Sequence, residues 1–461
     1  MLDTFLTKTG ALALAIVLII LSCFRWFGLL LHHRGRMAYR PTPFGKPPRD
    51  INVREIAVIL PVVNHQSENL IPTVESILMN LPGQLYVMVV GREAYDKVEP
   101  EMGTLRQKYK FSNIHVGAVN KANKRRQIAH ALGTINHRHS RLTVITEQGA
   151  YWSPLFLMSA CYPFDDTEVA AVTVPRMAHI PFSGGVWASI KAHLISFYYS
   201  VQAKDNRAVN SLDGSALFGG PTTLVRTHYL KEDRFKNEFE AETWVFERSG
   251  PLTGDEHFFL NRYLLRGNKK IFFQDSFEAV VWLEMNSVCD FVGGFLRTTR
   301  NNWRTCFSMA PTCAWLYVRH NHVIFPAAAF MTWWPTIFSF ALLIDILSII
   351  LAFNYSLLNK AALCVWITVT SLMVITQAVS SLSVAKRMYN NDFNVFVTFF
   401  CMLISFPFKY ALEFLKIVAL LTFWKTDAEG PSQAVEAMGE QNLPWSWDFC
   451  DEEQWIPGQF I

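Results

Sequence analysis

The stretch Ile56-Ala-Val-Ile-Leu-Pro61 is a short, uninterrupted apolar run, which is typical of a β-strand buried on both faces. Similar runs recur along the chain and alternate with stretches of helical character. We expect strands at 56–61, 85–90, 114–119, 142–146 and 169–175, and helices at 68–79, 94–108 and 121–132. This alternation predicts an α/β fold with a Rossmann-like, mostly parallel sheet covered on both faces. Ligands of such sheets bind beyond the carboxyl ends of the strands, so the loops between strands and helices are the places to search.

Apolar segments flank this predicted domain on both sides. One run covers residues 10–31 and is followed by basic residues, and three more cover 323–353, 361–384 and 393–423. A helix needs about 20 apolar residues to cross a bilayer, so we expect at least four spans in a multi-pass protein of the lipid bilayer. A cleaved signal peptide is the alternative for the first run, but no small-residue cleavage motif follows it. The basic residues after the first span predict a cytoplasmic α/β domain.

The expected organisation has five parts. Residues 1–50 form an N-terminal anchor with a basic juxtamembrane segment, 51–290 the α/β domain, 291–322 interfacial helices, 323–424 a transmembrane region of about three spans, and 425–461 an acidic tail. The formal net charge of +4 is too small to indicate a nucleic-acid partner. Eight cysteines without a CxxC pair argue against a disulfide framework or a zinc site.

Four motifs follow one another along the chain in a characteristic order: Val58-Ile-Leu-Pro-Val-Val-Asn64, Asn123-Lys-Arg-Arg-Gln127, Thr253-Gly-Asp-Glu256 with Arg262, and Arg297-Thr-Thr-Arg-Asn-Asn-Trp-Arg304. In this order and spacing, residues from about 51 to 425 resemble family 2 glycosyltransferases. The nearest resemblance is to a fungal branch similar to capsular polysaccharide synthases and, more distantly, to hyaluronan, chitin and cellulose synthases. It implies a GT-A fold, a UDP-sugar donor, a growing polysaccharide acceptor, and a plasma or secretory-pathway membrane.

The resemblance also implies a donor site. It assigns Asn64, Lys124, Arg125 and Glu147 to the nucleotide-sugar, because a cation after the third strand would offset the charge of the diphosphate. A basic helix start on the protein surface is an equally open interpretation of Lys124 and Arg125. Cations are unfavourable at a helix N-terminus, which favours the functional interpretation.

The general base and the metal site are implied at two further motifs. Glu256, with Asp255 before it, occupies the place of the family's catalytic carboxylate, although both could simply cap a helix over 257–265. The aspartate-rich motif that holds Mg²⁺ or Mn²⁺ in the family is replaced by Thr146-Glu-Gln-Gly149, in which only Glu147 is an anionic ligand. The aspartate that follows the second strand in the family is missing as well.

The acceptor side is implied by two basic or glycine-containing segments. Gly219 and Gly220 correspond to a loop that lets the backbone approach a sugar, although glycines also mark ordinary turns. The family's Gln-x-x-Arg-Trp motif is altered, but a set of basic and aromatic residues is retained that could contact acceptor and pyrophosphate: Arg297, Arg300, Trp303 and Arg304. An interfacial anchor helix is an equally good interpretation of that set.

Three functions are compatible with these patterns. The favoured one is a membrane-bound inverting glycosyltransferase that extends and translocates a polysaccharide. The second is a non-catalytic relative that acts as a membrane scaffold or regulatory subunit, since the metal motif is eroded. The third is a transporter, which the scarcity of charged residues in the apolar runs disfavours. A homo- or hetero-oligomer is compatible with each, because a partner subunit could supply missing ligands.

Overall fold

The computed structural model describes residues 33–43, 51–120, 123–179, 185–213, 220–243, 256–267, 269–284, 288–320 and 395–425, together with isolated positions within 16–30 and 382–384. The chain divides into two compact units. Unit 1 comprises Met1–Pro41, Pro175–Phe218 and Trp282–Phe423. Unit 2 comprises Thr42–Val174, Gly219–Val281 and Trp424–Ile461. The segment 175–218, which falls inside the expected 51–290 domain, thus groups with unit 1.

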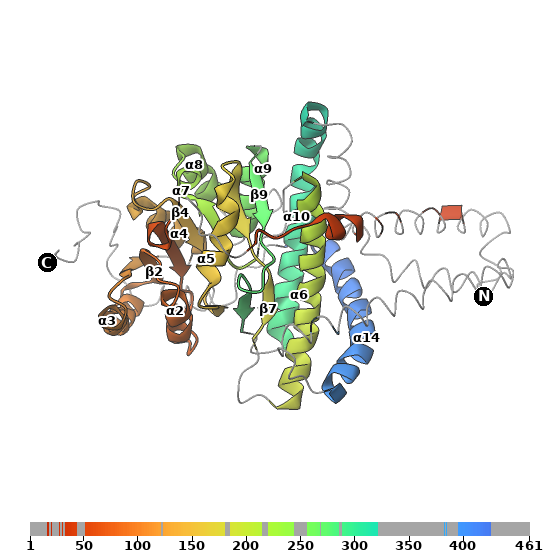
Figure 1. The fold of residues 1–461 in the computed structure, drawn as a ribbon, viewed down its shortest axis with the longest axis horizontal. Helices are drawn as coiled ribbons and strands as arrows, with labels where there is room; N and C mark the ends of the chain where they lie inside the picture. The colour runs from red at the N-terminus through yellow and green to blue at the C-terminus, as the bar shows by residue number, and fades with distance from the viewer. Residues whose placement is uncertain are drawn as a thin grey trace. The chain divides into compact units, whose positions relative to one another are not determined.

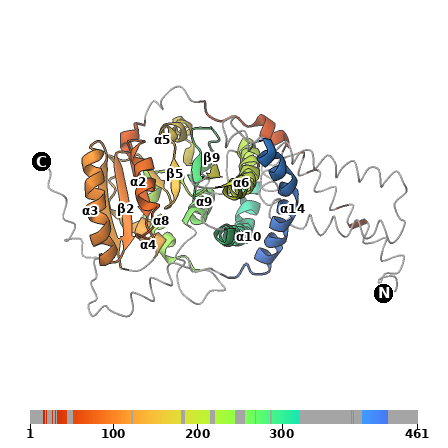
Figure 2. The same ribbon diagram turned by 90° about the horizontal axis from the view of Figure 1, so that it is seen from below.

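Unit 2 is built on a seven-stranded sheet in the order β3-β2-β1-β4-β8-β6-β9. Strand β2 lies near one end of this sheet and β9 at the other (Figure 1 and Figure 2). The strands are β1 (Ile56–Pro61), β2 (Gln84–Val90), β3 (Asn113–Val119), β4 (Leu142–Ile145), β6 (Val169–Thr173), β8 (Thr223–Arg226) and β9 (Lys270–Phe273). The first four pair in parallel, β8 runs antiparallel to both of its neighbours, and β6 pairs in parallel with β9. The expected mostly parallel sheet is therefore confirmed, with β8 as the exception.

Helices of unit 2 fill the connections between strands. They are α2 (Leu70–Leu78), α3 (Arg92–Lys108), α4 (Lys124–Thr134), α5 (Phe156–Cys161), α7 (Thr227–Leu230), α8 (Asp233–Ala241) and α9 (Glu256–Arg266); η2 (Val53–Glu55), η3 (Tyr162–Asp165) and β5 (Ala150–Trp152) are shorter elements. The connections through α3 and α4 cross the sheet in opposite directions, so right-handed crossovers put these helices on opposite faces (Figure 1). Every expected helix and strand of this region is present to within a few residues.

Burial explains why the strands form at these positions. All six residues of β1 are buried, as expected of a central strand covered on both faces. The Gln127 side chain on α4 is buried too, and its Nε2 donates hydrogen bonds to the carbonyls of Val62 (3.1 Å) and Met88 (2.6 Å). This amide ties α4 to the carboxyl ends of β1 and β2, where a ligand is expected.

The described part of unit 1 contains three long helices, α6 (Val186–Asp213), α10 (Val288–His320) and α14 (Val395–Leu420), together with β7 (Arg176–Ala178). The short strand β10 (Val281–Leu283) lies where the chain passes from unit 2 to unit 1. The helices share an apolar core in which Tyr199 of α6, Phe291 and Phe295 of α10, and Leu412 of α14 are buried together. The interfacial helices expected at 291–322 correspond to the single helix α10.

No helix in the described part of the chain combines the length and apolar character that a membrane crossing requires. The run at 323–353 lies outside the described residues, and the runs at 10–31 and 361–384 are described only at isolated positions. The third C-terminal run corresponds to α14, which carries Lys409, Glu413 and Lys416. The acidic tail beyond Lys425 also lies outside the described residues.

Candidate functional site

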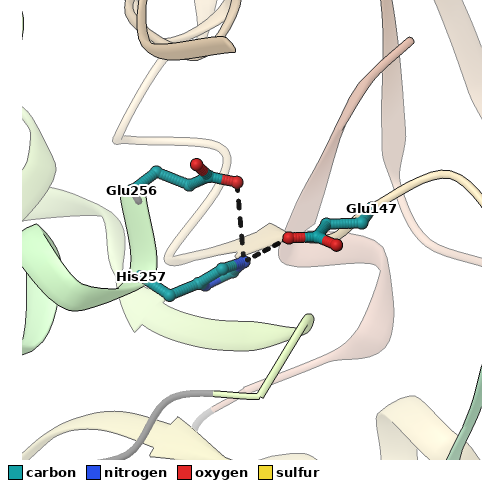
Figure 3. Close-up of side chains that lie close together, drawn as sticks. All are labelled: Glu147, Glu256 and His257. Atoms are coloured by element: carbon teal, nitrogen blue, oxygen red, sulfur yellow. Dashed lines mark ion pairs between the residues drawn. The ribbon is translucent and has the colours of Figure 1, made fainter. Parts of the chain in front are cut away.

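Three potential ligand groups meet in unit 2 from segments far apart in the sequence. Glu147 lies in the loop after β4, whereas Glu256 and His257 are the first two residues of α9. One oxygen of each glutamate and one ring nitrogen of His257 all lie within 4.8 Å of one another (Figure 3). The Glu256 side chain is 3% exposed, that of His257 8% and that of Glu147 29%. The site is therefore largely shielded from water but reachable from the Glu147 side.

The His257 ring is held from one side and left open on the other. Its Nδ1 lies 3.1 Å from Oγ1 of Thr223, a buried residue of β8. Its Nε2 points toward Oε1 of Glu147 and Oε1 of Glu256, each at 3.9 Å (Figure 3). A separation of 3.9 Å is too long for a hydrogen bond. Both Nε2 of His257 and Oε1 of Glu256 are buried and have no hydrogen-bond partner among the described residues.

Lys124, which follows the third strand, lies beside Glu147 of this group. The Asn123 side chain accepts a hydrogen bond from the Arg126 amide (3.1 Å), so it caps α4 and fixes Lys124 as the first helical residue. From there the Lys124 Nζ lies 3.9 Å from Oε1 of Glu147, with the side chain 11% exposed. A positive charge is thus placed beside the carboxylates in spite of the unfavourable helix terminus.

Asn64 contributes through its backbone. Its carbonyl accepts a hydrogen bond from Nε2 of Gln148 (2.8 Å), and its amide donates to Oε1 of the same side chain (3.4 Å). Its own side chain accepts from the Gln66 amide at 3.0 Å. Gln148, which stands where the resembling family has an acidic motif, therefore links the loops after β1 and β4 and holds Glu147 beside them.

Arg125 lies elsewhere, in a buried ion-pair network. Its side chain is fully buried, donates to the Phe239 carbonyl (2.9 Å) and to Oε2 of Glu242 (2.8 Å), and packs against the rings of Phe239 and Phe259. Arg262 donates to the other oxygen of Glu242 at 2.6 Å. Burial by itself would raise the pKa of Glu242, but the charges and hydrogen bonds of Arg262 and Arg125 outweigh it, and the pKa is lowered. The structure thus uses Arg125 as an internal tie, which the sequence did not predict.

The expected acceptor residues fall into separate places. Gly220 packs closely under β6, since a Cβ there would lie 3.1 Å from the Val174 carbonyl, whereas Gly219 and Asp255 lie outside the described residues. In unit 1, Arg300 donates to Oγ1 of Thr422 (3.0 Å) and Arg304 donates to the Phe423 carbonyl (2.9 Å).

Helix α10 carries the basic and aromatic residues of the expected acceptor set: Arg297, Arg300, Trp303 and Arg304. Arg300, Trp303 and Arg304 are buried, and Arg297 is half-buried. These contacts tie α10 to the end of α14. Arg300 and Arg304 therefore have an internal structural role. This is a third interpretation beside the acceptor-site and anchor-helix interpretations that the sequence left open.

Two functional candidates escaped the sequence reasoning. His257 directly follows Glu256, so a histidine beside a candidate carboxylate was the available signal. Thr223 gave none, because its position beside the ring depends on the antiparallel insertion of β8 between β4 and β6.

Comparison with known proteins bears on this site. No protein-family model matches the chain. A protein of Zymoseptoria tritici named type 2 glycosyltransferase is 25% identical over 282 residues, which are 61% of this chain and 56% of that protein. A protein of Gibberella zeae with the same name is 24% identical over 282 residues, 61% of this chain and 51% of that protein. The similarity to these relatives supports the prediction of a family 2 glycosyltransferase.

The chain spans about half the length of these type 2 glycosyltransferases. Among solved structures, a mannosyltransferase of Pyrobaculum calidifontis in complex with GDP-mannose and Mn²⁺ aligns with 82% of this chain and 99% of its own, at 14% identity and a TM-score of 0.46. The mostly parallel sheet of unit 2 is consistent with the GT-A fold of family 2 glycosyltransferases.

Proposed function

We propose that the chain transfers a sugar from a nucleotide-sugar donor to an acceptor hydroxyl at the site formed by Glu147, Glu256 and Lys124. The observation that carries this proposal is the buried Glu256 carboxylate, which lies in one cluster with Glu147 although the two residues are far apart in the sequence. The site lies where the sheet strands end, and the chain is similar to type 2 glycosyltransferases.

We expect a single displacement with inversion. The acceptor oxygen attacks the anomeric carbon as Oε2 of Glu256, the carboxylate oxygen that does not face His257, takes its proton. The bond from that carbon to the diphosphate oxygen breaks, and its electron pair leaves on the diphosphate. Lys124 stabilises the negative charge that develops on the leaving group, most effectively in a site shielded from water. Asn64, held against Gln148, shapes the loop that lies beside the donor.

A divalent cation, when bound, would neutralise the diphosphate. The fit of this chain to such an ion is seen in the unpartnered Nε2 of His257 and Oε1 of Glu256, which face Glu147. These three residues would hold the cation, of which the sequence indicated only Glu147.

The finer parts of the proposal are supported by motif order and by the apolar runs. We propose UDP as the nucleotide, a growing polysaccharide as acceptor in the manner of the capsular-synthase-like fungal branch, and translocation through a multi-pass region in the plasma membrane or a secretory-pathway membrane. That Arg297, Arg300, Trp303 and Arg304 contact acceptor and pyrophosphate stays a prediction.

A non-catalytic scaffold is the second candidate, and one observation favours it. Gln148 stands in the place of an acidic residue and uses both ends of its amide to join two loops, which is a structural role. Such a protein would bind the nucleotide-sugar, or a partner, without turnover.

The test is incorporation of labelled sugar by the purified full-length protein in detergent, with a panel of UDP- and GDP-sugars. Glu256→Gln should lower incorporation by at least about 100-fold, the usual loss when a general base is removed. Glu101→Gln, an exposed change on α3, should leave it unchanged. Full activity of Glu256→Gln would remove this residue from the mechanism, and nucleotide binding without transfer by the wild type would support the scaffold.

A further inference from the structure

We propose that Glu147, Glu256 and His257 bind one divalent transition-metal cation, with His257 as its nitrogen ligand. The cation's part in catalysis rests on the proposed function, whereas its binding is testable without it. The ligands come from two separate elements, the loop after β4 and the start of α9, and not from a single acidic motif.

Unsatisfied charge is the first reason for a cation. Two carboxylate oxygens face the same ring nitrogen at 3.9 Å each. Oε1 of Glu256 and Nε2 of His257 are buried and lack hydrogen-bond partners in the part of the chain that the structure describes. A buried acceptor without a partner costs about 1–3 kcal/mol, and more when it is charged. One cation bound here would be a partner for both of these buried atoms.

The distances leave room for an ion. Ligand atoms bound at about 2.1 Å in tetrahedral directions lie about 3.4 Å apart. The two separations of 3.9 Å that involve Nε2 of His257 therefore need to close by about 0.5 Å each. The glutamate oxygens, which lie within 4.8 Å of each other, need to approach as well, so the Glu147 side chain, which is 29% exposed, and the Glu256 side chain would both rotate. A cluster already collapsed into hydrogen bonds would offer no such space.

The ring orientation is the second reason. Oγ1 of Thr223 lies 3.1 Å from Nδ1 of His257, so a proton on Nδ1 can be donated to the hydroxyl. That tautomer leaves the lone pair of Nε2 directed at the two carboxylates (Figure 3). Histidine ligands of metal ions are commonly fixed in this way through their other nitrogen. Thr223 is thus a positioning residue for the ligand nitrogen.

The ligand set predicts which ions bind. Mg²⁺ favours oxygen ligands in octahedral geometry and keeps several waters. An imidazole suits transition metals such as Zn²⁺, Fe²⁺ and Ni²⁺ better, and within the first-row series a given site binds Mn²⁺ least tightly. The replacement of an acidic motif by Thr146-Glu-Gln-Gly149 is thereby offset by a histidine that shifts the preference away from Mg²⁺.

The experiment is calorimetric titration of Mn²⁺ into the full-length protein in detergent, without nucleotide. We expect one Mn²⁺ per chain, weaker binding of Mg²⁺, and at least about tenfold weaker Mn²⁺ binding by His257→Asn. His137→Asn, an exposed histidine between α4 and β4, is the matched control and should bind as the wild type does. Co²⁺ gives a second readout, since its visible absorption should change between wild type and His257→Asn.

Several outcomes overturn the proposal. They are equal Mn²⁺ affinity of wild type and His257→Asn, Mg²⁺ binding as tight as Mn²⁺ binding, and no Mn²⁺ binding by the wild type. If His257→Asn does not fold, Glu147→Gln replaces it with the same expected loss.

Metal binding and sugar transfer can fail independently. Sugar transfer in the presence of EDTA, without Mn²⁺ binding, would overturn the cation site and leave the proposed function intact. Mn²⁺ binding that His257→Asn weakens, without any sugar transfer, would support the cation site and count against the proposed function.

Discussion

The Glu242 carboxylate offers the most direct test of how unit 2 is held together. It accepts hydrogen bonds from Arg125 at 2.8 Å and from Arg262 at 2.6 Å, and these guanidinium groups are fully and nine-tenths buried, respectively. Glu242→Gln keeps the shape of the side chain but removes its charge. The two arginines would then face each other's charge across an amide.

The expected cost is about 3 kcal/mol. Removing one partner of a buried ion pair typically costs about 3–5 kcal/mol, and the lower end applies because the Glu242 side chain is 23% exposed. For a domain of 150–250 residues, each 1 kcal/mol shifts the unfolding midpoint by about 2–4 °C. Thermal unfolding followed by tryptophan fluorescence should therefore show a midpoint lowered by about 6–12 °C.

Glu238→Gln is the matched control on the same helix. Glu238 pairs with Arg234 at 2.8 Å, but these side chains are 39% and 74% exposed, and such surface pairs contribute about 0.2–1 kcal/mol. Its midpoint should fall by no more than about 4 °C. If Glu242→Gln shifts the midpoint no further than this control does, the assignment of Arg125 as a structural tie is refuted.

The same residue predicts a pH dependence. The pKa of Glu242 is lowered in the folded state, so its stabilisation is present above the ordinary carboxyl pKa and is lost as the pH falls through the lowered value. The midpoint difference between wild type and Glu242→Gln should be constant near neutral pH and shrink below about pH 4. A difference that grows on acidification would contradict the sign of this shift.

Three further predictions concern the site and the backbone. Thr223→Val removes the hydroxyl beside His257 Nδ1 and should weaken Mn²⁺ binding by about 10-fold in calorimetry. The control Thr143→Val removes a comparable buried hydroxyl contact to Thr227 and should leave Mn²⁺ binding unchanged. Equal Mn²⁺ affinities of Thr223→Val and the wild type would exclude a positioning role for Thr223. Gly103→Ala lies inside α3, where an added Cβ meets nothing within 4 Å, and should stabilise the protein by about 0.8–1 kcal/mol. Gly83→Ala should be strongly destabilising in the same thermal assay, because its Cβ would lie 1.8 Å from the Arg54 carbonyl oxygen; a tolerated Gly83→Ala would contradict that packing.

Much of the sheet could be predicted because the local sequence of its strands is distinctive. An apolar run such as 56–61 has few stable alternatives to a buried strand, and the helices between such runs follow from their own spacing. The short elements β8 and β9 were not predicted. Each has only four residues, and β8 becomes a strand because β4 and β6 supply partners on both of its sides.

The candidate site was predictable only in part. Glu147, Lys124 and Glu256 were found from motif order, and the structure brings Glu147 close to Lys124 and into one cluster with Glu256 and His257. Arg125 was misjudged because neighbouring helix residues point about 100° apart, so one basic residue of the pair faces the site and the other the interior.

The sequence by itself determined the α/β class, the order of its main strands and helices, and the residue types available at the strand ends, since each of these depends on local composition and spacing. Only the tertiary structure decided that Glu256 and His257 meet Glu147 from another segment, that Thr223 orients the imidazole, and that Glu242 takes Arg125 away from the site. These are contacts between distant segments, and their geometry depends on how the whole sheet is assembled.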